Sequence, residues 1–153
     1  MIFVILGTQK EQFTRLLRYV ENIKTKQKII VQAGYTKYES NKMKILSFIP
    51  TDQMERLMQD ADIIITHTGT GSVLTALSYG KKVIACPRLK KYKEHVDDHQ
   101  LELLNLFVSE GYILGANSQD DIDMAISEIG SFMPKQYKSN TASFISKLRK
   151  VID

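Results

Sequence analysis

The chain has 153 residues, of which 43% are hydrophobic and 25% are charged, and its formal net charge is +4. This composition is typical of a globular domain, and no apolar run approaches the ~20 residues that a membrane-spanning helix needs. The single cysteine, Cys86, excludes an intramolecular disulfide and fits a reducing compartment. The modest positive charge is compatible with nucleic acid, anionic lipid or a phosphorylated small ligand.

Strand-like and helix-like segments alternate along the chain. Apolar runs predict strands at 2–6, 27–34, 42–48, 62–66, 82–86 and 112–115, and the segments between and after them predict helices at 10–23, 51–61, 71–79, 97–110, 120–129 and 135–152. The N-terminal run MIFVILGT is expected to be the first core strand rather than a signal peptide. This alternation predicts a single α/β domain over residues 1–153, with a Rossmann-like parallel sheet covered by helices on both faces.

In such a sheet, ligands bind beyond the carboxyl ends of the strands. The first corner, GTQKEQF at 7–13, lacks the further glycines of a dinucleotide fingerprint but still exposes backbone N–H groups. The second, HTGTGS at 67–72, places two glycines where a strand hands over to a helix, and helix N-termini favour anions. No lysine follows its last glycine, so it is not a P-loop. The pattern predicts a cradle for a diphosphate or a sugar-linked phosphate, and a tight capped turn is the alternative.

A third group of polar residues follows the fifth strand in the segment RLKKYKEHVDDHQ. Asp98, His99 and Gln100 combine donors and acceptors in the way that recognition of sugar hydroxyls requires, although a helix cap alone accounts for the carboxylates. The basic run 88–93 is either a solvated loop or an anion-facing one. His67 either acts on a ligand, as a base or by orienting a phosphate, or is structural. The histidines are scattered, so no metal site is predicted.

The motifs HTGTGSVLTALSYGKKVIACPR and EHVDDHQLEL together resemble the donor-binding C-terminal half of GT-B glycosyltransferases of family 28. Within that family the resemblance is strongest to stand-alone subunits of bacterial capsule and exopolysaccharide synthesis, many of which are β-1,4-galactosyltransferases. A more distant resemblance is to the catalytic subunit of the eukaryotic two-part N-acetylglucosaminyltransferase that acts on dolichol-linked sugar. The resemblance covers nearly the whole chain and implies a UDP-sugar donor.

The resemblance also implies roles for individual residues. UDP and its diphosphate would be bound by Gly7, Thr8, Gln9, Thr68, Gly69, Thr70, Gly71, Ser72 and Thr75. Thr75 stands where much of the family has a glutamate that holds the ribose, a departure typical of the polysaccharide subgroup. The donor sugar would meet Asp98, His99 and Gln100, and the candidate general bases are His67 and His99, although a partner subunit is an alternative source of the base. Arg88, Lys90 and Lys91 would face the acceptor's diphosphate or an anionic membrane. The implied reaction is an inverting single displacement that needs no metal and no cofactor.

The family resemblance implies a partner as well. This chain corresponds to one half of a GT-B enzyme, so the other half is expected to be a membrane-anchored subunit that presents a lipid-diphosphate-linked saccharide. The protein is then expected to be cytoplasmic and peripheral at the inner face of the membrane. The helix expected at 135–152 carries an apolar stripe that either docks this partner or packs on its own domain, formed by Phe144, Ile145, Leu148, Val151 and Ile152.

The expected function is transfer of galactose from UDP-galactose, in β-1,4 linkage, during capsular or exopolysaccharide synthesis. One alternative is a UDP-sugar-binding regulatory or scaffold subunit without catalysis. A second is a nucleotide-sugar epimerase, which shares the GT-B architecture but normally has both halves in one chain. No nucleic-acid partner is expected, because only the basic loop supports one.

Overall fold

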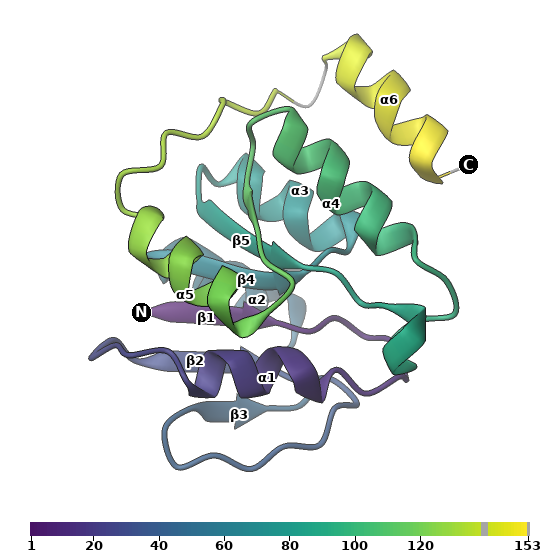
Figure 1. The fold of residues 1–153 in the computed structure, drawn as a ribbon. Coiled ribbons are helices and arrows are strands. Elements are labelled where there is room, and N and C mark those ends of the chain that lie inside the picture. The colour runs from purple at the N-terminus through teal and green to yellow at the C-terminus, as the bar shows by residue number, and fades with distance from the viewer. Residues whose placement is uncertain (139–140, 153) are drawn as a thin grey trace.

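The computed structural model describes residues 1–138 and 141–152, and its centre is a six-stranded parallel sheet (Figure 1). The strands lie in the order β3-β2-β1-β4-β5-β6. Their bounds are β1 Ile2–Ile5, β2 Ile29–Gln32, β3 Lys44–Leu46, β4 Ile63–His67, β5 Lys82–Cys86 and β6 Leu114–Gly115. In register, Ile5 of β1 lies opposite Gln32 on one side and Thr66 on the other. The order reverses between β1 and β4, so the two corners that follow these strands lie side by side.

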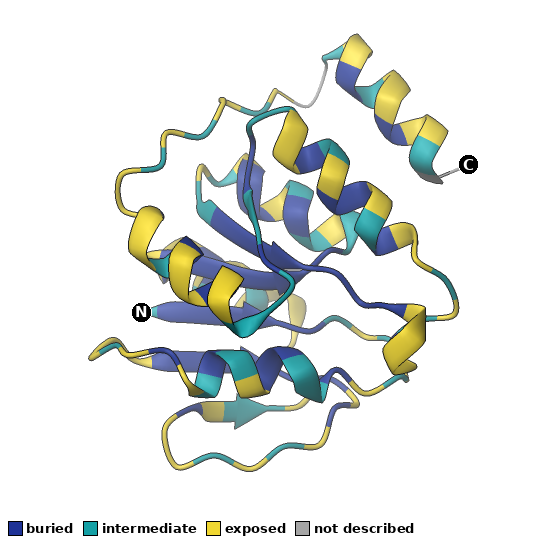
Figure 2. Cartoon of the chain, in the orientation of Figure 1, coloured by how far each residue is buried: buried dark blue, intermediate teal, exposed yellow. Residues whose placement is uncertain are grey.

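Helices cover both faces of the sheet, as the sequence predicts (Figure 1). They are α1 Thr14–Glu21, α2 Thr51–Asp60, α3 Thr70–Ser78, α4 His99–Ser109, α5 Gln119–Glu128 and α6 Ala142–Ile152, with a short 3₁₀ turn, η1, at Lys90–Tyr92. Ile2 and Val4 of β1 pack toward α1 and α5, whereas Phe3 and Ile5 belong to the core beneath α2, α3, α4 and α6. This alternation follows from the period of two along a strand, and it leaves β1, β2 and β4 buried on both faces (Figure 2).

The most consequential difference from the sequence prediction concerns the start of α1. The helix begins at Thr14 and not at residue 10. Phe13 has a non-helical backbone, with φ −123° and ψ 50°, and its N–H donates to Thr36 Oγ1 at 3.0 Å. The β1–α1 loop is therefore longer than expected and spans residues 6–13. It has enough length to contribute to two cavities at the carboxyl edge of the sheet.

The C-terminal helix also starts later than expected, at Ala142. Its Phe144 and Leu148 are buried in the core beneath α4, and the Phe144 ring centroid lies 4.9 Å from that of Tyr112. These two residues of the apolar stripe are thus covered by the domain itself, which supports internal packing over docking for them. The side chain of Ile152 lies outside the described residues. Among the described residues, none of the helices has the length and apolar composition of a membrane span.

Candidate functional site

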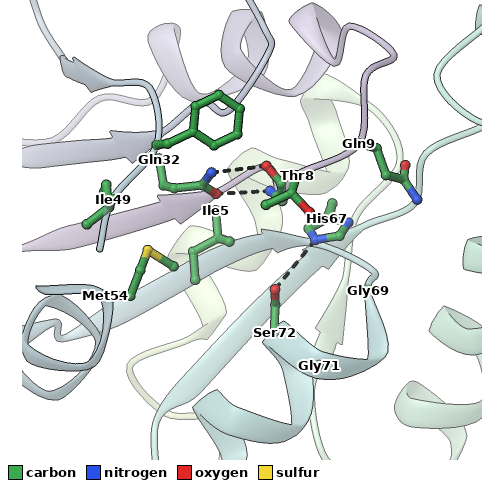
Figure 3. A pocket seen from close by; sticks show the side chains of 12 residues that line it. Ile5, Thr8, Gln9, Gln32, Ile49, Met54, His67, Gly69, Gly71 and Ser72 are labelled. Atoms are coloured by element: carbon green, nitrogen blue, oxygen red, sulfur yellow. Dashed lines mark hydrogen bonds between the residues drawn. The ribbon is translucent and has the colours of Figure 1, made fainter. Parts of the chain in front are cut away.

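A cavity of about 360 Å³ opens at the carboxyl edge of the sheet, where the strand order reverses (Figure 3). Its size lies within the range of small-molecule binding pockets. Six of the residues expected to bind a diphosphate line it: Gly7, Thr8, Gln9, Gly69, Gly71 and Ser72. The structure therefore brings the two predicted corners, which are about 60 positions apart in the sequence, to one cavity.

The β1–α1 corner is held in place by Gln32, at the end of β2. The Gly7 N–H donates to Gln32 Oε1 at 3.0 Å, and Gln32 Nε2 donates back to the Gly7 carbonyl at 3.0 Å (Figure 3). Gly7 has φ +84°, a conformation that strains any L-residue. Glycine is therefore required there for its backbone conformation as well as for the space that a side chain would take. These two hydrogen bonds fix the direction in which the β1–α1 loop leaves the sheet.

His67 fills the gap between the two glycine corners. A Cβ atom added to Gly7 would lie 2.6 Å from His67 Nε2, and one added to Gly69 would lie 2.3 Å from His67 Cε1. Both glycines therefore leave the room that the imidazole occupies. Only 7% of His67 is exposed, and Ser72 Oγ lies 3.5 Å from its Nε2, on the cavity side (Figure 3).

The tautomer of His67 follows from its contact with Gln100. Gln100 Oε1 accepts hydrogen bonds from the backbone N–H groups of Thr68 and Arg88, both at 3.0 Å. The amide nitrogen of Gln100 must then face His67 Nδ1, 3.1 Å away, and donate to it. Since Nδ1 accepts, the ring proton of neutral His67 is on Nε2. The imidazole presents a hydrogen-bond donor to the cavity, not a base.

Electrostatics lead to the same conclusion. Burial, reinforced by the positive charge of Arg88, lowers the pKa of His67 from 6.5 to about 3. A group with so low a pKa is neutral at physiological pH and is a weak proton acceptor. This argues against the expectation that His67 is the general base. A role as a neutral donor to a phosphate oxygen is consistent with both the tautomer and the pKa.

The low pKa of His67 predicts a pH-dependent loss of stability. The unfolded chain binds a proton at this residue below pH 6.5 and the folded chain does not until about pH 3, so folding becomes less favourable as the pH falls through this window. The expected slope from this residue is about 1.4 kcal/mol per pH unit. Denaturant unfolding of the wild type and of His67→Gln at pH 7, 5.5 and 4.5 measures it, because subtraction removes the carboxylates' contribution. Parallel pH dependences in the two proteins would contradict the assignment.

Helix α3 presents its N-terminus to the cavity. Gly69 is its N-cap and Gly71 and Ser72 lie in its first turn, and no side chain of the described residues caps it. The free N–H groups and the helix dipole favour an anion at this position. Of the remaining residues expected there, Thr70 is half-buried at the start of α3, Thr68 is fully buried, and Thr75 is exposed one turn further along. None of these three lines the cavity.

Arg88 does not face the acceptor or the membrane, and that expectation is corrected. Only 1% of the residue is exposed. Its guanidinium donates to the backbone carbonyls of Leu6 and Glu11, both at 2.7 Å, and of Glu94 at 3.1 Å. Burial lowers the pKa of Arg88 to about 10, so the group stays charged at neutral pH. Arg88 therefore ties the β1–α1 loop to the β5–α4 loop.

A second arginine, Arg15 of α1, strengthens the same junction. Its Nε and Nη2 donate to the two carboxylate oxygens of Glu94 at 2.9 Å each, and its Nη2 also donates to the Pro87 carbonyl at 2.7 Å. Burial alone would lower the pKa of Arg15, but the Glu94 carboxylate raises it overall. Glu94 is 3% exposed. This bidentate pair holds the β5–α4 loop against α1.

The residues expected to bind the donor sugar do not reach the cavity. Gln100 is 3% exposed, and its amide is used by Thr68, Arg88 and His67. Asp98 is exposed and accepts a hydrogen bond from the Lys90 N–H at 2.9 Å. His99 is 47% exposed, beside the carboxylates of Asp97 and Glu102. Gln100 and Asp98 therefore have mainly structural roles. Gln100 positions the corner at residues 67–72, and Asp98 holds the basic turn η1.

The two lysines expected to face an anion are on the surface. Lys90 and Lys91 are exposed in η1, and Lys91 Nζ lies 4.9 Å from the centroid of the Tyr92 ring. No described contact ties either ammonium group to an acidic residue. They remain available to a negatively charged surface, unlike Arg88.

Sequence reasoning missed five residues that line the cavity: Ile5, Gln32, Phe48, Ile49 and Met54. The signal for Gln32 was present, because a polar residue ends the apolar run IIVQ at the carboxyl end of a strand. Phe48, Ile49 and Met54 form an apolar wall, and Phe48 is 55% exposed with its ring edge-on to Tyr35. In the sequence, Phe48 and Ile49 look like the end of a strand and Met54 looks like part of a helix face, so nothing marks them as cavity residues.

Comparison with known proteins agrees with this geometry. The model of the glycosyltransferase family 28 C-terminal domain matches residues 1–153. The chain belongs to glycosyltransferase family 28. The six-stranded sheet and its helices correspond to the C-terminal domain of a GT-B glycosyltransferase, and this family 28 domain aligns over 97% of its length with 37% of the spinosyn forosaminyltransferase SpnP, at a TM-score of 0.58 and 16% identity.

The family 28 chain is also similar to named transferase subunits. It is 32% identical over 75 residues to the UDP-N-acetylglucosamine transferase subunit ALG13 of Saccharomyces cerevisiae, an alignment that covers 48% of this chain and 35% of the yeast protein. Against the subunit of the same name from Cryptococcus neoformans, it is 29% identical over 105 residues, which is 67% of this chain and 50% of that protein. The chain thus spans half or less of these curated relatives. The solution structure of ALG13 superimposes over 99% of this chain and 96% of its own, with a TM-score of 0.66 and 20% identity.

Proposed function

We propose that this family 28 domain is the donor-binding, catalytic subunit of a two-component inverting glycosyltransferase that transfers a hexose from a UDP-sugar. The observation that supports this most strongly is the cavity between two glycine corners at the reversal point of the sheet. The loop with Gly7, Thr8 and Gln9 lines the cavity on one side, and the uncapped start of α3 lines it on the other. The free N–H groups at the start of α3 favour an anion such as a diphosphate.

The rest of the cavity suits the remaining parts of a nucleotide. Phe48, Ile49 and Met54 form an apolar wall that offers a contact for a base. Ile49 and Met54 lie at the side of the cavity away from Gln9 (Figure 3). Thr75, exposed on α3, has only one hydroxyl to offer a ribose. We therefore expect the diphosphate, and not the ribose, to contribute most of the binding energy.

The chemistry follows from where negative charge develops. In an inverting displacement an acceptor hydroxyl attacks the anomeric carbon, and the bond to the UDP oxygen breaks with its electrons. The growing charge on UDP lies among the N–H groups of α3, with the Nε2–H of His67 and the Ser72 hydroxyl close by. We propose that these donors stabilise the leaving group and that the reaction needs no metal or cofactor.

We further propose a partner and a location. The relatives in Saccharomyces and Cryptococcus are each named as a subunit of a transferase, which supports an assembly with a second subunit. We propose that this subunit is membrane-anchored and presents a lipid-diphosphate-linked saccharide, with the chain itself peripheral at the inner, cytoplasmic face of the membrane. Lys90 and Lys91 would approach the anionic surface or the acceptor's diphosphate.

Two donor hexoses, galactose and N-acetylglucosamine, remain to be compared. The sequence resemblance to polysaccharide subunits supports galactose in β-1,4 linkage for capsular or exopolysaccharide synthesis, whereas the names of the relatives support N-acetylglucosamine as the donor to compare with it. A reconstituted complex with the membrane subunit, a short-chain N-acetylglucosaminyl or glucosyl diphosphate lipid and a panel of UDP-sugars decides between them. We expect transfer with inversion from UDP-galactose. Donor binding without transfer from any UDP-sugar would instead indicate the regulatory or scaffold role.

A further inference from the structure

The β5–α4 loop carries three exposed lysines. Lys90 and Lys91 lie in η1, and Lys93 follows it directly (Figure 2). The carboxylate that comes next in the sequence, Glu94, is buried against Arg15. In the part of the chain that the structure describes, none of the three lysines forms a salt bridge. The loop therefore presents positive charge that no bound carboxylate neutralises.

Two exposed apolar side chains accompany these lysines. Tyr92 is 50% exposed and Val96 is 72% exposed. Lys91 Nζ lies 4.9 Å from the centroid of the Tyr92 ring. Val96 lines a cavity of about 270 Å³ together with exposed Lys10 of the β1–α1 loop, which places a fourth lysine beside the β5–α4 loop. Lysines around an exposed aromatic ring are typical of a surface that lies in the headgroup region of a membrane.

The β5–α4 loop is fixed to the domain at its base. The Leu89 N–H donates to Glu94 Oε1 and the Glu94 N–H donates to the Leu89 carbonyl, both at 3.1 Å. Arg15 holds the Glu94 carboxylate with two hydrogen bonds. Lys93 has φ +59°, in the left-handed region, and this conformation turns the chain back after η1. A loop that is already ordered loses little conformational entropy when it binds.

The exposed acidic residues that follow the lysines are engaged within the same loop. Asp98 Oδ1 accepts a hydrogen bond from the Lys90 N–H at 2.9 Å. Asp97 Oδ1 lies 3.0 Å from His95 Nδ1. The two carboxylates reduce the local positive charge but do not cancel that of the four lysines.

A second cluster of lysines lacks the apolar neighbours. Lys24, Lys26 and Lys28 are exposed between α1 and β2. None of the exposed large hydrophobic side chains in the described structure belongs to residues 24–28. This cluster precedes β2 and so lies at the amino edge of the parallel sheet, whereas η1 follows β5 at the carboxyl edge, where the donor cavity opens. The two clusters have equal charge and differ in surroundings and position.

We propose that the β5–α4 loop binds the anionic surface of a membrane directly, without a partner subunit. The lysine ammonium groups meet lipid phosphates, and Tyr92 and Val96 enter the headgroup region. Because the loop follows β5, this contact turns the carboxyl edge of the sheet toward the lipid headgroups. The inference goes beyond an anchor supplied by a partner. It rests on the loop and not on the donor site, so it can fail while the proposed function stands.

Sedimentation of the full chain with lipid vesicles tests the role of the lysines. We expect binding to phosphatidylcholine vesicles that contain about one third phosphatidylglycerol, no binding to phosphatidylcholine alone, and release at ~0.5 M salt. Replacing Lys90, Lys91 and Lys93 together with glutamine is expected to weaken binding about 100-fold, at about fivefold per lysine. The matched control replaces Lys24, Lys26 and Lys28 with glutamine and is expected to stay within about threefold of the wild type.

Equal losses in the two triple variants would overturn the proposal, because they would show that net charge alone drives the binding. So would a wild type that ignores anionic vesicles. A wild type that binds a single-stranded oligonucleotide in their place would also overturn it, and would assign the loop to nucleic acid.

A fluorescence measurement locates the contact independently. The chain has no tryptophan, so Tyr92→Trp introduces a single reporter in the loop. We expect its emission to shift to shorter wavelength on anionic vesicles and to be quenched by brominated lipid. Met133→Trp is the control, since Met133 is 86% exposed beyond the end of α5, and its emission is expected to stay unchanged. Unchanged emission of Tyr92→Trp on vesicles that bind the protein would refute the assignment of the contact to this loop.

Discussion

Replacing Arg88 with methionine is expected to remove a large part of the stability of the domain. The variant fills a similar volume, but the carbonyls of Leu6, Glu11 and Glu94 lose their common donor inside the protein. The carboxylate of Glu94 also loses a neighbouring positive charge. Breaking a buried charged network of this kind costs about 3–5 kcal/mol, out of the ~5–15 kcal/mol that a domain typically has. Denaturant unfolding followed by circular dichroism measures the loss.

The control for this prediction is Lys90→Met in the same basic segment. Lys90 is exposed, so its replacement is expected to change the free energy of unfolding by less than about 0.5 kcal/mol. Had Arg88 faced an acceptor, the two variants would unfold alike and Arg88→Met would lose only transfer. Equal denaturation midpoints for Arg88→Met and the wild type would therefore refute the buried role.

Gly69→Ala is expected to damage both the fold and the donor site. Its new Cβ would lie 2.3 Å from His67 Cε1 and 2.8 Å from His67 Nε2. His67 cannot retreat, because Gly7 confines it on the opposite side and Gln100 holds its Nδ1. Overpacking of this kind costs about 1–3 kcal/mol, and the corner must move to relieve it. We expect a lower unfolding midpoint together with a UDP affinity that is reduced by about tenfold or more.

Gly71→Ala is the matched control, two residues further along the same segment. A Cβ added to Gly71 has no heavy atom within 4 Å, and this glycine lies in the first turn of α3. Alanine is the better helix former by up to ~1 kcal/mol, so the variant is expected to be as stable as the wild type or slightly more so. Equal losses of stability in the two variants would show that His67 does not confine Gly69.

The sheet and the two corners were predictable because local patterns determine them. The run at 2–6 is apolar throughout, and the runs at 62–66 and 82–86 are apolar in their central positions, as central strands of a parallel sheet must be. Once the strands are parallel, their carboxyl ends share an edge, and the corners at Gly7 and Gly69 must approach each other. No contact between distant residues had to be known for this step.

The burial of Arg88 and Gln100 was not predicted, because it depends on contacts between residues that are far apart in the sequence. Arg88 and Gln100 are polar residues in a polar segment, and such residues are usually exposed. Their burial depends on partners far away in the sequence, such as Leu6 for Arg88 and His67 for Gln100. Spacing along the chain does not reveal such pairings.

Calorimetric titration of UDP into the wild type and Gly71→Glu tests the central claim most directly. A glutamate in the first turn of α3 suits the helix dipole and meets open space, so the variant should stay folded, but its carboxylate would repel a diphosphate at the same point. We predict that the wild type binds UDP and that Gly71→Glu binds it about tenfold more weakly or worse. A wild type that ignores UDP, or a variant that binds it equally well, would contradict the assignment of the two glycine corners to an activated sugar's diphosphate.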